Sequence, residues 1–141
     1  MDPRPETDGA STVTPAHRMA ARRMGLWIAT VAMYYTVCLA TAPAEKLTTS
    51  TLLALLPVCA ALIGLFLTLC WRVATGRSVG AAMAWVVGYA ALGTVVMVAM
   101  MATRTTYANA PLVAASWGVQ LVAAIWAVPA LQRARPTEAT S

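Results

Sequence analysis

Charged and metal-binding side chains are scarce in this sequence. Only 11% of the 141 residues are charged, whereas soluble domains carry about 25%. The single histidine, His17, lies near the N-terminus, and four long apolar stretches contain no acidic residue. Haem, zinc and di-iron sites need several ligands close together, and acid–base or triad catalysis needs paired ionisable groups. The sequence therefore predicts a non-enzymatic protein with no metal and no cofactor.

The missing carboxylates also exclude one class of small transporter. Proton- or cation-coupled transporters use an ionisable residue at membrane depth, and small multidrug-resistance transporters carry a membrane-embedded Glu in their first helix. The corresponding part of this chain offers Thr30, Tyr34 and Tyr35 instead. That mechanism is therefore excluded.

The three cysteines have neither redox nor zinc-binding spacing. Cys38 and Cys70 are expected near opposite ends of their helices, about a bilayer thickness apart, so they cannot form a disulfide. Together with Cys59, they are expected to act as small apolar packing residues.

Hydrophobic residues, by contrast, make up 60% of the chain. They gather in four stretches that contain no Asp, Glu, Lys, Arg or His: residues 24–41, 52–71, 79–102 and 111–131. Each is near the roughly 20 residues that a helix needs to cross a bilayer. The connections are short, so sequential helices should be antiparallel neighbours. The predicted fold is all-α, an up-down-up-down bundle of four transmembrane helices.

Polar segments flank these stretches and set the predicted domain boundaries. Residues 1–17 are rich in Pro, Thr and acidic residues and show no apolar periodicity, which is typical of a disordered tail. Residues 136–141 form a second short polar segment. We expect two disordered cytoplasmic tails, 1–17 and 136–141, around a transmembrane domain of residues 18–135.

The basic residues indicate the orientation. Eight of the ten lie on one side of the predicted helices: Arg4, Arg18, Arg22, Arg23, Arg72, Arg77, Arg133 and Arg135. This bias predicts a multi-pass protein of the cell membrane with both termini in the cytoplasm. Trp27, Trp71 and Trp126 are expected to anchor the cytoplasmic interface. Because the basic residues are dispersed at helix ends, the expected partner is the lipid bilayer and not nucleic acid.

A ridge of small residues lies on the third stretch. Gly80, Ala84 and Gly88 recur every four residues, a pattern that lets helix backbones approach closely. Two interpretations stay open. The ridge packs inside the bundle, or it docks on a partner membrane protein or on a second copy of the chain.

A set of polar residues lies near the predicted membrane midplane: Tyr34, Tyr35, Tyr89 and Gln120. A buried Gln side chain needs a hydrogen-bond partner at that depth. Tyr89 and Gln120 are expected at matching depths on neighbouring helices, which predicts a Tyr89–Gln120 hydrogen bond. The alternative is a polar lining for a ligand or a solute path.

Two cations are expected on the outer side. Lys46 and Arg104 are flanked by Thr and Ser residues and form a candidate contact for an anionic headgroup or solute. The alternative is ordinary solvation of the helix ends.

The chain resembles uncharacterised four-helix integral membrane proteins of actinobacteria over residues 20–135. The most specific stretch is Val119–Arg133, which ends in Pro129-x-Leu131-x-Arg133. The pattern of that family has His at the position of Gln120, which puts any role of that His in doubt for this chain. The resemblance implies a fold and no activity.

These features favour a membrane protein that works through helix–helix contacts, as an accessory, assembly or scaffold subunit. The alternative is a small oligomeric transporter, flippase or pore that uses the midplane polar residues. A third hypothesis is a non-catalytic subunit of a membrane enzyme.

Overall fold

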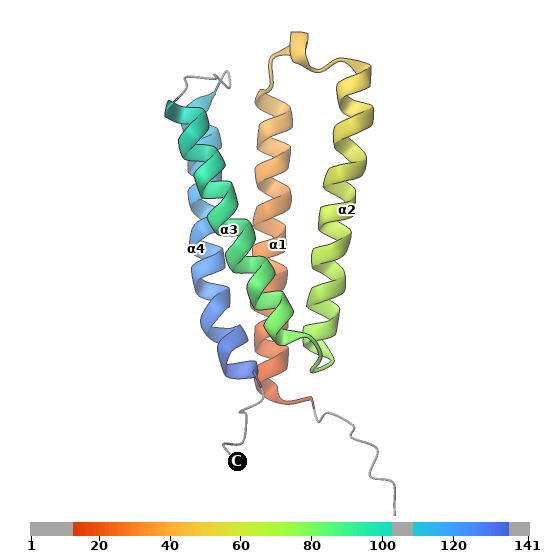
Figure 1. Cartoon of the computed structure of the whole chain (residues 1–141), viewed down its shortest axis with the longest axis vertical. Helices are drawn as coiled ribbons and strands as arrows, with labels where there is room; N and C mark the ends of the chain where they lie inside the picture. The colour runs from red at the N-terminus through yellow and green to blue at the C-terminus, as the bar shows by residue number, and fades with distance from the viewer. Residues whose placement is uncertain (1–12, 103–108, 136–141) are drawn as a thin grey trace, which may run out of the picture.

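The computed structural model describes residues 13–102 and 109–135 and shows an all-helical bundle (Figure 1). Its four long helices are α1 (Pro15–Thr41), α2 (Thr49–Ala74), α3 (Val79–Ala102) and α4 (Ala110–Ala134), with a 3-10 turn, η1 (Ala44–Lys46), between α1 and α2. The shortest, α3, has 24 residues, about 36 Å at the α-helical rise. All four are long and apolar enough to cross a membrane. The predicted fold class is confirmed, and each of the four predicted stretches lies within one of these helices.

The first helix begins earlier than the sequence suggested. It starts at Pro15 and takes in His17, so the last residues of the predicted tail 1–17 are helical. Proline suits this first helical position because its missing N–H would have no partner there. The Thr14 N–H donates to His17 Nδ1 over 3.2 Å, which satisfies one free donor at the helix start. The other residues of the two predicted tails lie outside the described residues.

The turn between α2 and α3 depends on Gly76. This residue has φ 76°, a left-handed conformation that costs glycine little. The Gly76 N–H donates to the Val73 carbonyl over 3.0 Å, and the Arg77 N–H donates to the Arg72 carbonyl over 2.7 Å. These two bonds form a Schellman motif, which ends α2 and reverses the chain into α3.

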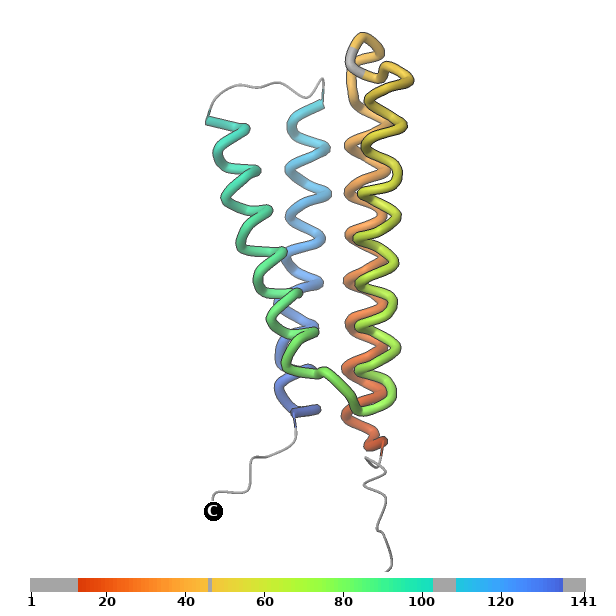
Figure 2. Tube along the Cα trace, turned by 45° about the vertical axis from the view of Figure 1, so that its right-hand side comes forward, coloured from red at the N-terminus to blue at the C-terminus, as the bar shows by residue number. Residues whose placement is uncertain are grey.

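The described arginines all lie at the end of the bundle where α1 begins and α4 ends, called the arginine end below: Arg18, Arg22, Arg23, Arg72, Arg77, Arg133 and Arg135. Helix α1 packs extensively against α4 and α2, and α3 packs mainly against α4. Among helices that follow each other in the chain, α2 and α3 contact each other least. Both views show α3 leaving α2 as it runs away from the arginine end (Figures 1 and 2).

Candidate functional site

The centre of the bundle is a chain of aromatic rings contributed by all four helices. Trp27 on α1 meets Phe66 on α2 with ring centroids 4.8 Å apart and Tyr89 on α3 at 5.8 Å, both edge to face. Phe66 also meets Tyr89 at 5.3 Å. On the side away from the arginine end, Trp117 on α4 meets Tyr34 at 5.2 Å. Edge-to-face pairs of this kind stabilise beyond their buried area, so the rings fix the relative positions of the helices.

Trp27 occupies the core and is not an interfacial anchor as predicted. Its side chain is fully buried, whereas Trp71 and Trp126 are exposed as the anchor role requires. Trp126 also receives two contacts from Arg23. An Arg23 guanidinium N–H donates to the Trp126 carbonyl over 3.0 Å, and the guanidinium carbon lies 4.4 Å from the ring centroid.

The midplane polar residues pair differently from the prediction. The Tyr89 hydroxyl donates to the Tyr35 hydroxyl over 3.0 Å, which joins α3 to α1. Tyr34 packs against Tyr35 and Trp117. Gln120 lies beside the Tyr89 hydroxyl, but neither of its amide atoms has a hydrogen-bond partner in the described residues. The predicted Tyr89–Gln120 hydrogen bond is therefore replaced by the bond between Tyr89 and Tyr35.

Gln120 is the unusual member of the set. Its side chain is 1% exposed, and neither its Oε1 nor its Nε2 has a hydrogen-bond partner in the described residues. The Trp27 Nε1 is also buried without a partner there. The neighbouring buried Ser116, by contrast, donates to the Val113 carbonyl over 2.8 Å. A buried amide without a partner lowers the free energy of unfolding by about 1–3 kcal/mol. Gln120 therefore either destabilises the bundle without benefit or serves a function that needs a buried polar group.

Gly93 on α3 leaves the space that the ring of Trp117 on α4 occupies. A Cβ at this position would overlap the ring of Trp117. The same ring is 5% exposed, and its Nε1 donates to Thr94 Oγ1 over 3.3 Å. Sequence reasoning missed this contact because it looked for small residues at a four-residue spacing. An isolated glycine such as Gly93, with no small residue four positions before or after it in the predicted ridge, carries no such signal.

The small-residue ridge is split by the structure. At Gly80, an added Cβ would lie 3.3 Å from Nη2 of Arg135, so this residue packs inside the bundle. Ala84 and Gly88 are exposed, and an added Cβ at Gly88 would have no neighbour within 4 Å. The outward part of the ridge is therefore not used for packing within the described residues of this chain.

The predicted outer anion contact cannot be placed. Arg104 lies outside the described residues. Lys46 belongs to η1, but its side chain is likewise outside the description. Among residues 13–102 and 109–135, no three His, Cys, Asp or Glu side chains gather where a metal ion could bind.

Comparison of the chain with protein-family models, with curated proteins and with solved structures found no match. The functional argument therefore rests on the positions of the side chains. Three features stand out: the aromatic core, the buried Gln120 amide without a hydrogen-bond partner in the described residues, and the exposed face of small residues on α3.

Proposed function

We propose that this chain is a non-enzymatic membrane subunit that associates with another membrane protein through the outward face of α3. The supporting observation is the position of Ala84 and Gly88, which face away from α1, α2 and α4. Ala81 and Ala91 extend the same exposed face by one turn in each direction. The centre of this face is therefore made of small side chains over about three turns.

The physics of helix association in lipid favours this use of the face. Lipid tails are as apolar as leucine, so burying apolar area gives no driving force between helices. Association depends on close van der Waals contact, and small residues allow a partner backbone to approach. At Gly88, space for at least a methyl group is open toward the outside, so a partner backbone laid along Ala84 and Gly88 can make close contact there.

The proposed orientation places the arginine end in the cytoplasm of a cell that carries this protein in its plasma membrane. Seven arginines lie at this end. Glu45, the one acidic residue among those described, lies at the opposite end, within η1. Retention of basic residues on the cytoplasmic side is the main determinant of orientation for short connections.

A matched pair of glycine substitutions tests the association. Gly88→Leu and Gly64→Leu both add bulk where an added Cβ meets nothing within 4 Å, the first on α3 and the second on α2. The free energy of unfolding of the isolated chain should change little in either variant. On blue native gels of membranes solubilised in mild detergent, Gly88→Leu should lose the higher-mass complex, and Gly64→Leu should keep it.

Equal complex formation by both variants would contradict the proposal. So would equal loss, because the α3 face would then not be the specific interface.

A second candidate function is a small oligomeric transporter, and Gln120 is the observation that favours it. A buried amide with two unpaired polar atoms is the kind of group that a polar ligand would satisfy. Complementation of a deletion strain with Gln120→Leu separates the two candidates. Growth defects in a strain whose mutant protein is stably folded would favour transport, and full complementation would favour the association role.

A further inference from the structure

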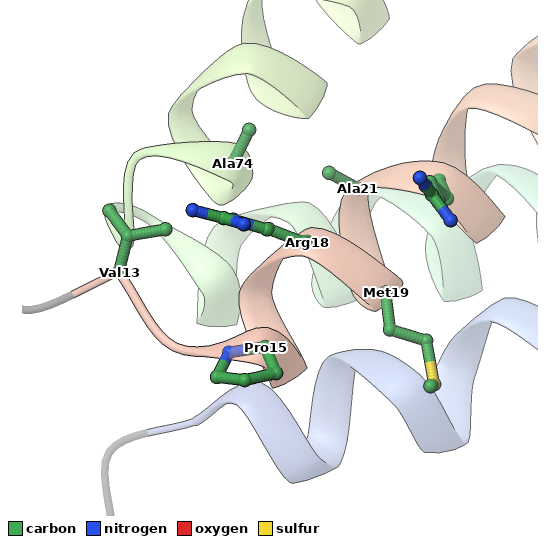
Figure 3. A pocket seen from close by; sticks show the side chains of 7 residues that line it. Val13, Pro15, Arg18, Met19, Ala21 and Ala74 are labelled. Atoms are coloured by element: carbon green, nitrogen blue, oxygen red, sulfur yellow. The ribbon is translucent and has the colours of Figure 1, made fainter.

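The arginine end contains a pocket between the start of α1 and the end of α2. It has a volume of about 630 Å³ and is lined by side chains from both helices: Val13, Pro15, Arg18, Met19, Ala21, Arg22 and Ala74. Figure 3 shows the Arg18 side chain reaching from α1 toward Ala74 in the last turn of α2. Two cationic groups therefore share one hollow with an otherwise apolar lining.

The charges of this pocket are uncompensated within the described chain. Arg23 is held by Trp126, but the guanidinium groups of Arg18 and Arg22 make no hydrogen bond or ion pair with residues 13–102 and 109–135. These two arginines are four residues apart on one helix, where like charges repel each other. Arg18 also lies at the end of the first turn of α1, which has no acidic residue, and cations are unfavourable near a helix N-terminus.

An anion in the pocket would remove both penalties. It would neutralise the like-charge pair and would complement the positive end of the α1 dipole. Arginine binds phosphate oxygens through two parallel N–H donors. The chemistry of the pocket therefore fits a phosphate group.

The depth of the pocket identifies the source of that phosphate. The apolar part of α1 begins at Met24. At the helical rise, Arg22 and Arg18 lie about 3 and 9 Å beyond that point, which is the depth of the headgroup layer next to the hydrocarbon core. An amphiphile matches the mixed lining better than a free anion, because Val13, Met19 and Ala74 give apolar contact beside the two guanidinium groups.

We infer that this pocket binds the phosphate headgroup of an anionic phospholipid from the leaflet at the arginine end. The site is made by α1 and α2, whereas the proposed interface is on α3, so this inference does not depend on the proposed function. Bound lipid would tie the start of α1 to the end of α2.

The test uses the full-length protein in a neutral detergent and dioctanoyl-phosphatidylglycerol as the probe. Binding to the folded state raises the midpoint of thermal unfolding, and the rise grows with the logarithm of the ligand concentration relative to Kd. We expect a saturable rise with this lipid and none with dioctanoyl-phosphatidylcholine, which has no net charge, or with glycerol 3-phosphate, which has no acyl chains.

Two double variants, each of which removes two positive charges at the arginine end, test whether the pocket itself is the binding site. Arg18→Gln with Arg22→Gln should weaken binding at least about tenfold, because charge-assisted bonds to phosphate are lost. Arg72→Gln with Arg133→Gln removes two exposed arginines of the same end that do not line the pocket, and it should change the affinity by less than about twofold. Ala74→Leu fills the pocket with every charge kept and should also weaken binding.

Several results would overturn the inference. Equal weakening by both double variants would indicate attraction to the general charge of this end. An equal rise with glycerol 3-phosphate would indicate a site for soluble anions, and an equal rise with phosphatidylcholine would show that the headgroup charge is not recognised. If the Arg18→Gln, Arg22→Gln double variant does not fold without lipid, Ala74→Leu becomes the deciding variant. Unchanged lipid binding by Ala74→Leu would then be enough to overturn the inference.

Discussion

The half of the bundle near the arginine end is packed differently from the half beyond the aromatic rings. In the first half, all four helices contribute to one buried cluster that includes Met24, Phe66, Val86 and Leu131. In the second half, the fully buried cluster is only Met97, Val113 and Trp117 of α3 and α4, and α1 adds half-buried side chains such as Tyr34 and Val37, whereas α2 adds none. Within α2, Cys59 is the one buried residue before Phe66. The bundle is thus held together mainly at one end.

This difference follows from the solvent. In water, the exposed leucines at the start of α2 would have to be covered, but hydrocarbon does not penalise them. Helices in lipid need to touch only where side chains interlock or form hydrogen bonds. The second half can therefore open between α2 and α3 at little cost, and this leaves helix faces free for lipid or for a partner.

The largest expected effect comes from removing the same side chain from the two halves of α2. Leu69 is 7% exposed in the packed half, and Leu53 is 70% exposed in the other. Leu69→Ala should lower the free energy of unfolding by about 2–4 kcal/mol, because it leaves a cavity. Leu53→Ala should cost less than about 0.5 kcal/mol. Unfolding by sodium dodecyl sulfate in mixed micelles measures the free energy of unfolding of both variants. Equal losses would contradict the conclusion that α2 is packed at one end of the bundle only.

The next effect concerns Gly93, where the two halves meet. Gly93→Ala should lower the free energy of unfolding by about 1–3 kcal/mol, since the buried Trp117 ring must move to admit a methyl group. The hydrogen bond from Trp117 to Thr94 should weaken in the same variant. Gly88→Ala, on the same helix with open space around it, is the control and should be neutral or slightly stabilising. The prediction fails if the two alanine variants unfold alike.

Gln120 should show an effect of the opposite sign. Gln120→Leu removes a buried amide that has no partner in the described residues, so we expect a gain of about 1 kcal/mol in the free energy of unfolding. Ser116→Ala removes a buried hydroxyl that has a partner and should cost up to about 1 kcal/mol. A loss of stability in Gln120→Leu would show that the amide makes a favourable interaction in the membrane.

The sequence predicted the helices well because the signals for their bounds are local. The stretch 79–102 coincides with α3, since the turn at Gly76 and the end of the apolar run both mark it. The sequence did not predict which face of each helix points inward. In a soluble helix the polar face gives this information, but α3 is apolar on all sides, so Gly88 and Gly93 are equivalent by composition. The same ambiguity placed Trp27 at the interface, although its side chain is fully buried.

The smallest expected effect is that of the hydrogen bond between Tyr35 and Tyr89. This bond joins α1 to α3 at the level where the packed half ends. Interhelical hydrogen bonds in membranes contribute about 0.6 kcal/mol on average, so the coupling free energy from Tyr35→Phe, Tyr89→Phe and the double variant should be of that order. The rings stay in place in all three variants, because Tyr89 also packs against Trp27 and Phe66. A coupling near zero would show that aromatic packing alone sets the boundary between the two halves. A coupling above about 1.5 kcal/mol would show that the hydroxyl pair is the main link between α1 and α3 at this level.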